Sequence, residues 1–242
     1  MPDSRARLIV ALDVPTAAAA HKIVAAVGDS ARIYKVGMQL YTAEGPQIVR
    51  DLIASGRQVF LDLKYHDIPN TVAGAVLAAA ALPNVQLVNV HALGGTAMMQ
   101  AAAQAVSAGV PMGADRTRLL AVTLLTSMDT KTVRDVGIGG PPKTRVVKLA
   151  KLSQKAGVDG VVASVQEAKG IRKACGPEFL IVTPGVRPNG AELSKDDQAR
   201  TATPHEAIKA GADFIVVGRP ILAAADPRAA AQAIVDEIAS AK

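Results

Sequence analysis

Short apolar runs alternate with longer segments of helical character along the whole chain. A short apolar run bounded by polar or turn-forming residues is typical of a strand that is covered on both faces. On this basis the sequence predicts strands at Leu8–Leu12, Arg32–Val36, Val59–Leu63, Val85–Val90, Leu119–Leu125, Gly160–Ser164, Phe179–Thr183 and Phe214–Val217.

The segments between these runs have the composition and spacing of helices. The predicted helices are Thr16–Val27, Ala43–Ser55, Pro69–Leu82, Gly95–Ala108, Thr144–Ala156, Gln166–Cys175, Pro204–Ala210 and Asp226–Ala239. Thr16 is expected to cap the first helix, and Gly56 to end the second. A polar connection rich in glycine and proline is expected at Ser127–Pro142, and a long loop at Pro184–Ala202.

A strand followed by a helix, repeated eight times, predicts an all-parallel sheet. Two segments are similar to each other, KAGVDGVVAS at Lys155–Ser164 and KAGADFIVVG at Lys209–Gly218, and they lie 54 residues apart. That separation equals two units of about 27 residues, as repeated units of a closed barrel would give. An open doubly wound sheet would carry glycines after its first strand, and ALDVPT has none. We predict one (β/α)8 barrel domain spanning residues 1–242.

Composition narrows the class of protein further. Half of the residues are apolar, yet no apolar run is long enough to cross a membrane. The apolar segment before Asp13 is too short for a signal peptide. The single Cys175 excludes a disulfide framework within the chain and fits a reducing compartment, so a cytoplasmic location is expected.

The chain is basic, with 27 Lys and Arg against 21 Asp and Glu. Nucleic-acid binding is not favoured, because the basic residues are spread along the chain and aromatic residues make up only 2%. A small anionic substrate would be favoured by the same positive field.

Polar residues follow nearly every predicted strand. In a (β/α)8 barrel the carboxyl ends of the strands form the active site. The residues expected there are Asp13, Lys35, Asp62, Lys64, His91, Thr126, Ser127, Ser164, Arg187, Gly218 and Arg219. Arg187 and Arg219 fall on the loops after the last two strands, a usual phosphate site, so the sequence predicts a phosphorylated small molecule as substrate.

Asp62 and Lys64 are two residues apart, so on an extended chain they point to the same face. Such a pair is also the pattern of a structural salt bridge. Imine formation by Lys35 or Lys64 and proton delivery to a carbon are both open. Carboxylates flanking Lys64 would keep it protonated, which favours proton delivery. The four histidines show no metal-ligand spacing, but Asp13, Asp62 and Asp67 leave a Mg²⁺ site open.

Several motifs together resemble the orotidine 5'-phosphate decarboxylase family over nearly the whole length. They are ALDVPT, YKVGMQLY, FLDLKYHDIPNTV, VNVHALGG, AVTLLTSMD, TPGVRP with the downstream DDQAR, and VVGRPI. The segment DLKYHDIPNT is the most specific of them. The resemblance implies a barrel that decarboxylates orotidine 5'-phosphate to UMP and CO2 without a cofactor or metal ion.

The resemblance also implies a role for each matching residue. Lys64 would protonate C6 of the pyrimidine within a charged array made with Lys35, Asp62 and Asp67. The substrate-binding residues implied are Asp13, Lys35, Asp67, Ile68, Thr71, Thr126, Ser127, Pro184, Arg187, Gln198, Gly218 and Arg219. Asp67 and Thr71 would reach the site of the partner subunit in a homodimer.

Two alternatives stay open at this point. One is a Mg²⁺-dependent decarboxylase or aldolase acting on a 3-keto sugar phosphate, because the shorter D-x-K-x-x-D pattern is shared with such enzymes. The other is a barrel that binds a nucleotide without catalysis, although a binder gains nothing from burying that array.

Overall fold

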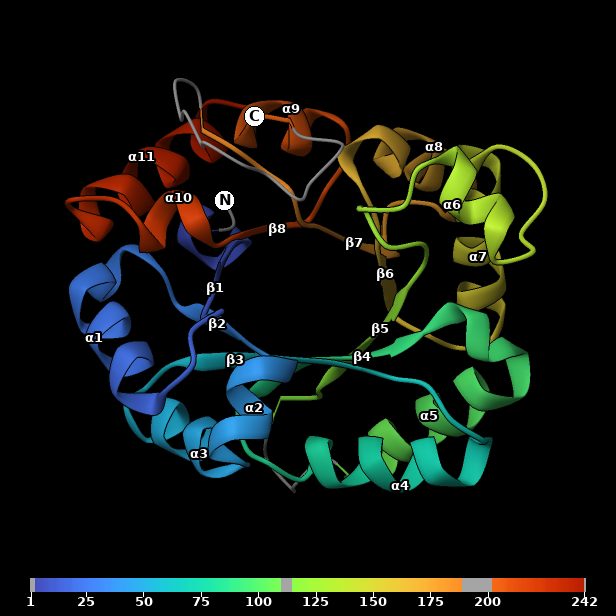
Figure 1. Ribbon diagram of the computed structural model, residues 1–242, viewed down its shortest axis with the longest axis horizontal. Helices are drawn as coiled ribbons and strands as arrows, with labels where there is room; N and C mark the ends of the chain where they lie inside the picture. The colour runs from blue at the N-terminus through green and yellow to red at the C-terminus, as the bar shows by residue number, and fades with distance from the viewer. Residues whose placement is uncertain (1–2, 110–114, 189–201, 242) are drawn as a thin grey trace.

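The computed structural model describes residues 3–109, 115–188 and 202–241. Eight parallel strands close into a barrel in sequential order, with helices around it (Figure 1). The strands are β1 (Leu8–Ala11), β2 (Ile33–Gly37), β3 (Gln58–Tyr65), β4 (Val85–His91), β5 (Arg118–Val122), β6 (Gly160–Val162), β7 (Leu180–Thr183) and β8 (Phe214–Val217). The predicted (β/α)8 barrel is therefore confirmed.

The helices lie outside the barrel. They are α1 (Ala17–Val27), α2 (Met38–Glu44), α3 (Gln47–Ala54), α4 (Pro69–Ala80), α5 (Gly95–Gly109), α6 (Thr130–Asp135), α7 (Pro142–Lys155), α8 (Val165–Cys175), α9 (Pro204–Lys209), α10 (Arg219–Leu222) and α11 (Pro227–Ser240). Short 3-10 turns occur at Ser4–Arg7, Gly28–Ser30 and Ala92–Gly94. No helix of the described residues is long and apolar enough to span a membrane.

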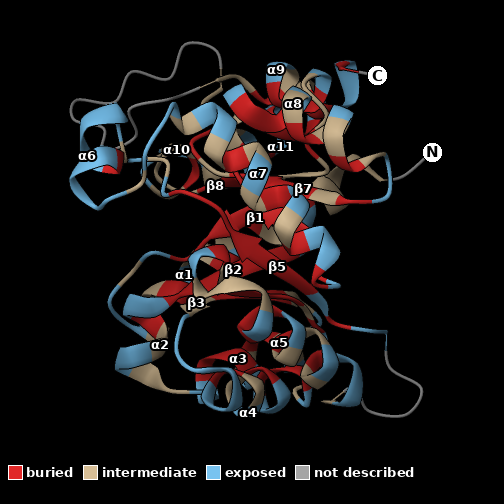
Figure 2. Ribbon diagram, turned by 90° about the vertical axis from the view of Figure 1, so that its right-hand side faces the viewer, coloured by how far each residue is buried: buried red, intermediate tan, exposed pale blue. Residues whose placement is uncertain are grey.

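Alternation along each strand separates two layers of core. In β1, Leu8 and Val10 pack outward against the helices, while Ile9 and Ala11 point into the barrel. The interior is filled by Ile9, Ala11, Ile33, Phe60, Leu87, Leu120, Val182 and Val216. Both faces of the strands are thus covered, which explains their continuous apolar sequence (Figure 2).

One predicted helix is wrong. Instead of a single helix at Ala43–Ser55, the chain forms α2 and α3, separated at Gly45 and Pro46. Gly45 has φ +64° and its N–H caps α2 on the Tyr41 carbonyl at 2.8 Å. Pro46 lacks the N–H that a continuous helix would need, so the helix restarts after it.

Two further predictions need correction. The Ser127–Pro142 connection contains the short helix α6, capped by Asp129 through the Thr132 N–H at 2.8 Å. The fifth strand ends at Val122 rather than at Leu125. Thr123 still donates its N–H to the Val162 carbonyl of β6 at 3.2 Å, and the next two residues, Leu124 and Leu125, line the cavity described below.

Candidate active site

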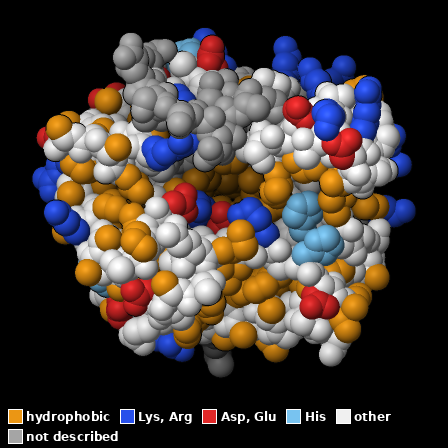
Figure 3. All heavy atoms as spheres, viewed as in Figure 1, with side chains coloured by type: hydrophobic (Ala, Val, Ile, Leu, Met, Phe, Trp, Pro, Cys, Tyr) orange, Lys and Arg blue, Asp and Glu red, His pale blue; other side chains and the backbone are white. Residues whose placement is uncertain are grey.

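A cavity of about 570 Å³ opens at the carboxyl ends of the strands. Its polar side chains come from Asp13, Lys35, Asp62, Lys64, Thr126, Ser127, Arg187 and Arg219, and Pro184, Gly185 and Gly218 line it beside them. Apolar side chains from the barrel interior, among them Phe60 and Val216, line it as well. Figure 3 shows charged side chains gathered in this hollow. The structure therefore brings most of the predicted strand-end residues together.

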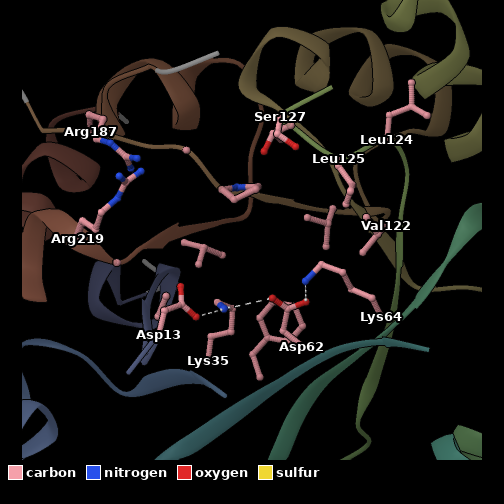
Figure 4. Close-up of a pocket in the computed structure, with 18 residues that line it drawn as sticks. Asp13, Lys35, Asp62, Lys64, Val122, Leu124, Leu125, Ser127, Arg187 and Arg219 are labelled. Carbon is pink, nitrogen blue, oxygen red and sulfur yellow. Dashed lines mark hydrogen bonds and ion pairs between the residues drawn. The ribbon is translucent and has the colours of Figure 1, made fainter. Parts of the chain in front are cut away.

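Four charged side chains form a continuous row along one side of the cavity (Figure 4). The Lys35 Nζ lies 2.8 Å from Asp13 Oδ1 and 3.3 Å from Asp62 Oδ2. The Lys64 Nζ lies 2.7 Å from Asp62 Oδ1. Acid and amine groups alternate in this row, so each charge lies against one of opposite sign.

Both inner members of the row are buried. Lys35 is 9% and Asp62 is 8% exposed. Burial opposes the charged form of Lys35, but the carboxylates of Asp62 and Asp13 outweigh it and raise its pKa. Burial likewise opposes ionised Asp62, but Lys35 and Lys64 lower its pKa below the usual value. The ion pair is therefore charged at neutral pH.

The two lysines differ in the number of carboxylates that they contact. The Lys35 ammonium lies between two carboxylates. The carboxylates expected on both sides of Lys64 are present on one side within this chain, as Asp62. Within the described residues, Lys64 Nζ pairs with Asp62 alone. Both lysines line the cavity, but the Lys64 side chain is 27% exposed against 11% for that of Lys35.

Lys64 does not sit on a regular strand. Its backbone φ is +51°, a left-handed conformation that residues other than glycine rarely adopt. The pairing of β3 with β4 shifts here, because four steps from Leu61 to Tyr65 face two steps from Val88 to Val90. The expectation that Asp62 and Lys64 share a face is met by this bulge and not by an extended strand.

A residue that the sequence analysis missed lies opposite the bulge. Asn89 of β4 is fully buried, accepts the Lys64 N–H at 2.8 Å and donates to Asp62 Oδ1 at 2.6 Å. The available signal was an amide between the apolar Val88 and Val90 of its strand, because a buried amide needs partners.

The opposite side of the cavity carries two guanidinium groups. Arg187 follows β7 and Arg219 follows β8, and Figure 4 shows their guanidinium groups side by side. The Arg187 N–H donates to the Ala202 carbonyl at 2.9 Å, which fixes the base of its loop. Adjacent glycines, Gly185 and Gly218, leave room for backbone N–H groups to approach an anion. Two adjacent cations of this shape can bind the oxygens of a phosphate.

Some of the predicted residues do not line this cavity. Asp67, Ile68 and Thr71 lie exposed after β3, and the Asp67 carboxylate accepts its neighbour's N–H at 2.6 Å. Gln198 lies outside the described residues. Among those described, no cluster of His, Cys, Asp or Glu side chains could hold a metal ion.

Two histidines stack at the edge of the site. The rings of His66 and His91 are 5.4 Å apart at 17°. Burial, together with the nearby His66 and Lys64, lowers the pKa of His91 to about 4. His91 is therefore neutral at physiological pH, and its Nδ1 accepts the Leu93 N–H at 3.3 Å.

Comparison with known proteins finds similar sequences over nearly the whole chain. The model of the orotidine 5'-phosphate decarboxylase / HUMPS family matches residues 6–234. Orotidine 5'-phosphate decarboxylase of Pelobacter propionicus is 53% identical over 98% of this chain and 96% of its own length. That of Halorhodospira halophila is 55% identical over 97% of each chain.

Solved structures are similar as well. A crystal structure of orotidine 5'-phosphate decarboxylase from Lactobacillus acidophilus matches with a TM-score of 0.86 at 40% identity, covering 96% of this chain and 99% of that one. The enzyme from Pyrococcus horikoshii OT3 matches with a TM-score of 0.75 at 27% identity, with the same coverage.

Proposed function

Because the chain belongs to the orotidine 5'-phosphate decarboxylase / HUMPS family, we propose that it converts orotidine 5'-phosphate to UMP and CO2 in pyrimidine biosynthesis. The observation that carries the proposal is one cavity with an alternating row of charges on one side and two guanidinium groups on the other. A phosphorylated nucleotide with a carboxylate on its base has complementary groups at both places.

Lys64 is the proton donor in this proposal. Breaking the bond between C6 and the carboxylate leaves an electron pair on C6, and no ring carbonyl is conjugated with it. A fixed ammonium beside C6 stabilises that charge as it develops. The Lys64 Nζ then transfers a proton to C6, which completes UMP, and solvent restores the ammonium.

Asp62 faces the substrate carboxylate. Its pKa is low, so it stays ionised and meets a second negative charge when substrate binds. Like charges in contact destabilise the bound carboxylate, and loss of CO2 relieves this. Lys35 holds Asp62 in place at 3.3 Å, and with Asp13 it also faces the ribose hydroxyls.

The other polar lining residues bind the rest of the nucleotide. Thr126 and Ser127 contact the pyrimidine edge, and Pro184, Arg187, Gln198, Gly218 and Arg219 surround the phosphate. The phosphate lies away from C6, so its binding energy is available to hold the base against the charged row.

The exposed residues after β3 complete the site of a second subunit. Asp67, Ile68 and Thr71 do not line the cavity of their own chain, and Ile68 is 66% exposed. We propose a homodimer in which Asp67 and Thr71 reach the partner's charged row and ribose. Mixing inactive Lys64→Ala and Asp67→Ala chains should restore activity, because a mixed dimer holds one intact site. Confirmed heterodimers without activity would refute this sharing.

The experiment that tests the function is ultraviolet absorbance of orotidine 5'-phosphate with the purified protein and EDTA. Rapid loss of the orotate absorbance is expected. A flat trace with folded protein would contradict the proposal. Activity on a 3-keto sugar phosphate with added Mg²⁺ would then indicate the other enzyme class, and tight UMP binding without any turnover would indicate a binding protein.

A further inference from the structure

Asn89 joins the backbone of Lys64 to the carboxylate of Asp62. Its Oδ1 accepts the Lys64 N–H at 2.8 Å, and its Nδ2 donates to Asp62 Oδ1 at 2.6 Å. The same Asp62 oxygen accepts the Lys64 ammonium at 2.7 Å. The orientation of the amide is fixed, because only its oxygen can accept an N–H and only its nitrogen can donate to a carboxylate.

The strand pairing explains why an amide is needed at this position. The bulge places three residues of β3, Asp62 to Lys64, opposite the single residue Asn89 of β4. The Lys64 N–H therefore lies outside the regular hydrogen bonding between the two strands. A left-handed conformation at a residue with a side chain costs about 1–2 kcal/mol. It persists only where the surroundings hold it, and the Asn89 side chain supplies the missing acceptor.

We propose that Asn89 is a positioning residue. Its amide oxygen holds Lys64 in the left-handed conformation, and its amide nitrogen orients the Asp62 carboxylate. The Lys64 ammonium and the Asp62 carboxylate then both face the cavity. The kinetic consequences of this inference rest on the proposed function. The geometric consequences do not, because they concern the shape of the bulge.

Asn89→Ala removes both hydrogen bonds. Lys64 is then free to relax toward an extended conformation, which moves its ammonium. A displacement of about 1 Å at a reacting group can lower turnover about 10²-fold. We expect a fall in kcat of that size, while binding of UMP, which depends on the phosphate side of the cavity, changes little.

Asn89→Asp tests the hydrogen bond to Lys64 and the hydrogen bond to Asp62 separately. The aspartate keeps an acceptor for the Lys64 N–H, but a second carboxylate now faces Asp62. The two cannot both ionise at contact without repulsion, and Lys35 and Lys64 keep Asp62 ionised, so the proton resides on residue 89. That protonated acid donates to Asp62 as the amide did. Turnover should therefore be retained at low pH and should fall as pH rises through a new pKa that the wild type lacks.

The other charged groups around the row are the same in both proteins. They are Asp13, Lys35, Asp62 and Lys64 within the row, His66 and His91 beside Lys64, Arg187 and Arg219 across the cavity, and Asp67 of the partner subunit in the proposed homodimer. A pH limb that appears only in Asn89→Asp therefore belongs to the new carboxylate.

Thr117→Val is the matched control. Thr117 is 2% exposed and donates to the Val85 carbonyl at 2.7 Å near the start of β5, at the other end of the barrel. Losing this buried hydrogen bond should lower the melting temperature without changing the pH profile. A similar profile in Thr117→Val and Asn89→Asp would show a merely structural effect and overturn the proposal.

Amide hydrogen exchange of the wild type tests the geometry without any assay of turnover. The Lys64 N–H should be protected, although it is outside the ladder, and rapid exchange would overturn the inference even if no Asn89 variant folds. If the wild type leaves orotidine 5'-phosphate unchanged, the proposed function fails. The Lys64 exchange and its loss of protection in Asn89→Ala still decide the positioning role separately.

Discussion

Both ends of the barrel have a cavity and paired charges, but the charged side chains have different hydrogen-bond partners at the two ends. The cavity at the carboxyl ends measures about 570 Å³, and one at the opposite end measures about 510 Å³. The second is lined by residues at the starts of strands, including Arg116, Arg118, Asp159 and Glu178. Size and charge alone therefore do not separate the functional end from the other.

The hydrogen-bond partners do separate them. At the amino end, Asp159 accepts the Leu119 N–H at 2.7 Å and also binds Arg116. Asp213 likewise accepts the Ile181 N–H at 2.7 Å and Arg172 at 2.6 Å. These carboxylates tie the starts of strands to neighbouring elements. Their role is to stabilise the barrel.

At the carboxyl end the charges are satisfied by one another. Within the described residues, Asp62 accepts only from the side chains of Lys35, Lys64 and Asn89. None of these three donors is a backbone N–H, and the two ammonium groups line the cavity. The comparison teaches that a carboxylate bound by the backbone N–H of a strand supports the fold, whereas one bound only by side chains at a cavity is a candidate for chemistry.

The largest expected effect is at Lys64. Lys64→Ala should lower kcat by about 10³-fold or more, because it removes both the proton donor and the fixed charge beside C6. Steady-state kinetics with orotidine 5'-phosphate, alongside urea unfolding, measures the split between activity and stability. Near-normal turnover in this variant would remove Lys64 from the proposed mechanism.

Lys64→Gly is the control for backbone strain. Glycine adopts φ +51° without penalty, whereas in an ordinary strand it costs about 0.5–1 kcal/mol relative to alanine. Lys64→Gly should therefore be at least as stable as Lys64→Ala, although both are inactive. A clearly less stable glycine variant would show that the left-handed conformation is not strained.

The next effect is at Arg219. Arg219→Ala should weaken binding of UMP by about 2–5 kcal/mol, since it leaves the phosphate without one of its two guanidinium groups. Calorimetry with UMP and with uridine measures the part that depends on phosphate, and uridine binding should not change. Arg118→Ala is the matched change at the amino end, where the side chain is 54% exposed, and it should leave UMP binding intact. Equal losses in both variants would contradict a local phosphate site.

At the amino end the expected effect is on stability. Asp159→Ala should lower the free energy of unfolding by about 2 kcal/mol, because the Leu119 N–H and Arg116 lose their acceptor. Its kcat should match the wild type. Urea unfolding and kinetics on the same preparation test both statements. A large fall in kcat without loss of stability would mean that the two ends are not divided as proposed.

The sequence predicted the elements that depend on local pattern. The strands were located because each is a short apolar run, and parallel strands bring Asp13, Lys35 and Asp62 to one end regardless of exact boundaries. The predictions that were wrong or missing concern details of the backbone. The break at Gly45 and Pro46 lies inside a helical pattern, and the bulge beside Asn89 depends on how β3 pairs with β4, which a single sequence does not reveal. Contacts within one chain also left the expected pair of carboxylates around Lys64 half complete, because among the described residues only Asp62 reaches it there.

The smallest expected effect concerns His91, where the carboxyl end should be sensitive to acid. Its pKa is lowered from 6.5 to about 4 in the folded protein, so the unfolded chain binds more protons between these values. Stability from the neutral ring is therefore complete above pH 6.5 and is lost as pH falls toward 4. The stability that ionised Asp62 contributes is lost only below this window, because its pKa is lowered from 3.8.

His91→Phe keeps a ring against His66 but cannot be protonated. At about pH 7 it should be less stable than the wild type by up to ~1 kcal/mol, since the Leu93 N–H loses its acceptor. At about pH 5 the difference should shrink or reverse, because only the unfolded chain of the wild type binds a proton at residue 91, and this lowers the stability of the wild type alone. Urea unfolding at both pH values measures this difference, with His205→Phe, a partly buried histidine of α9, as the control. If the difference in free energy of unfolding were the same at both pH values, protonation of His91 would not destabilise this end of the barrel. Any acid sensitivity there would then have to come from the carboxylates of the row.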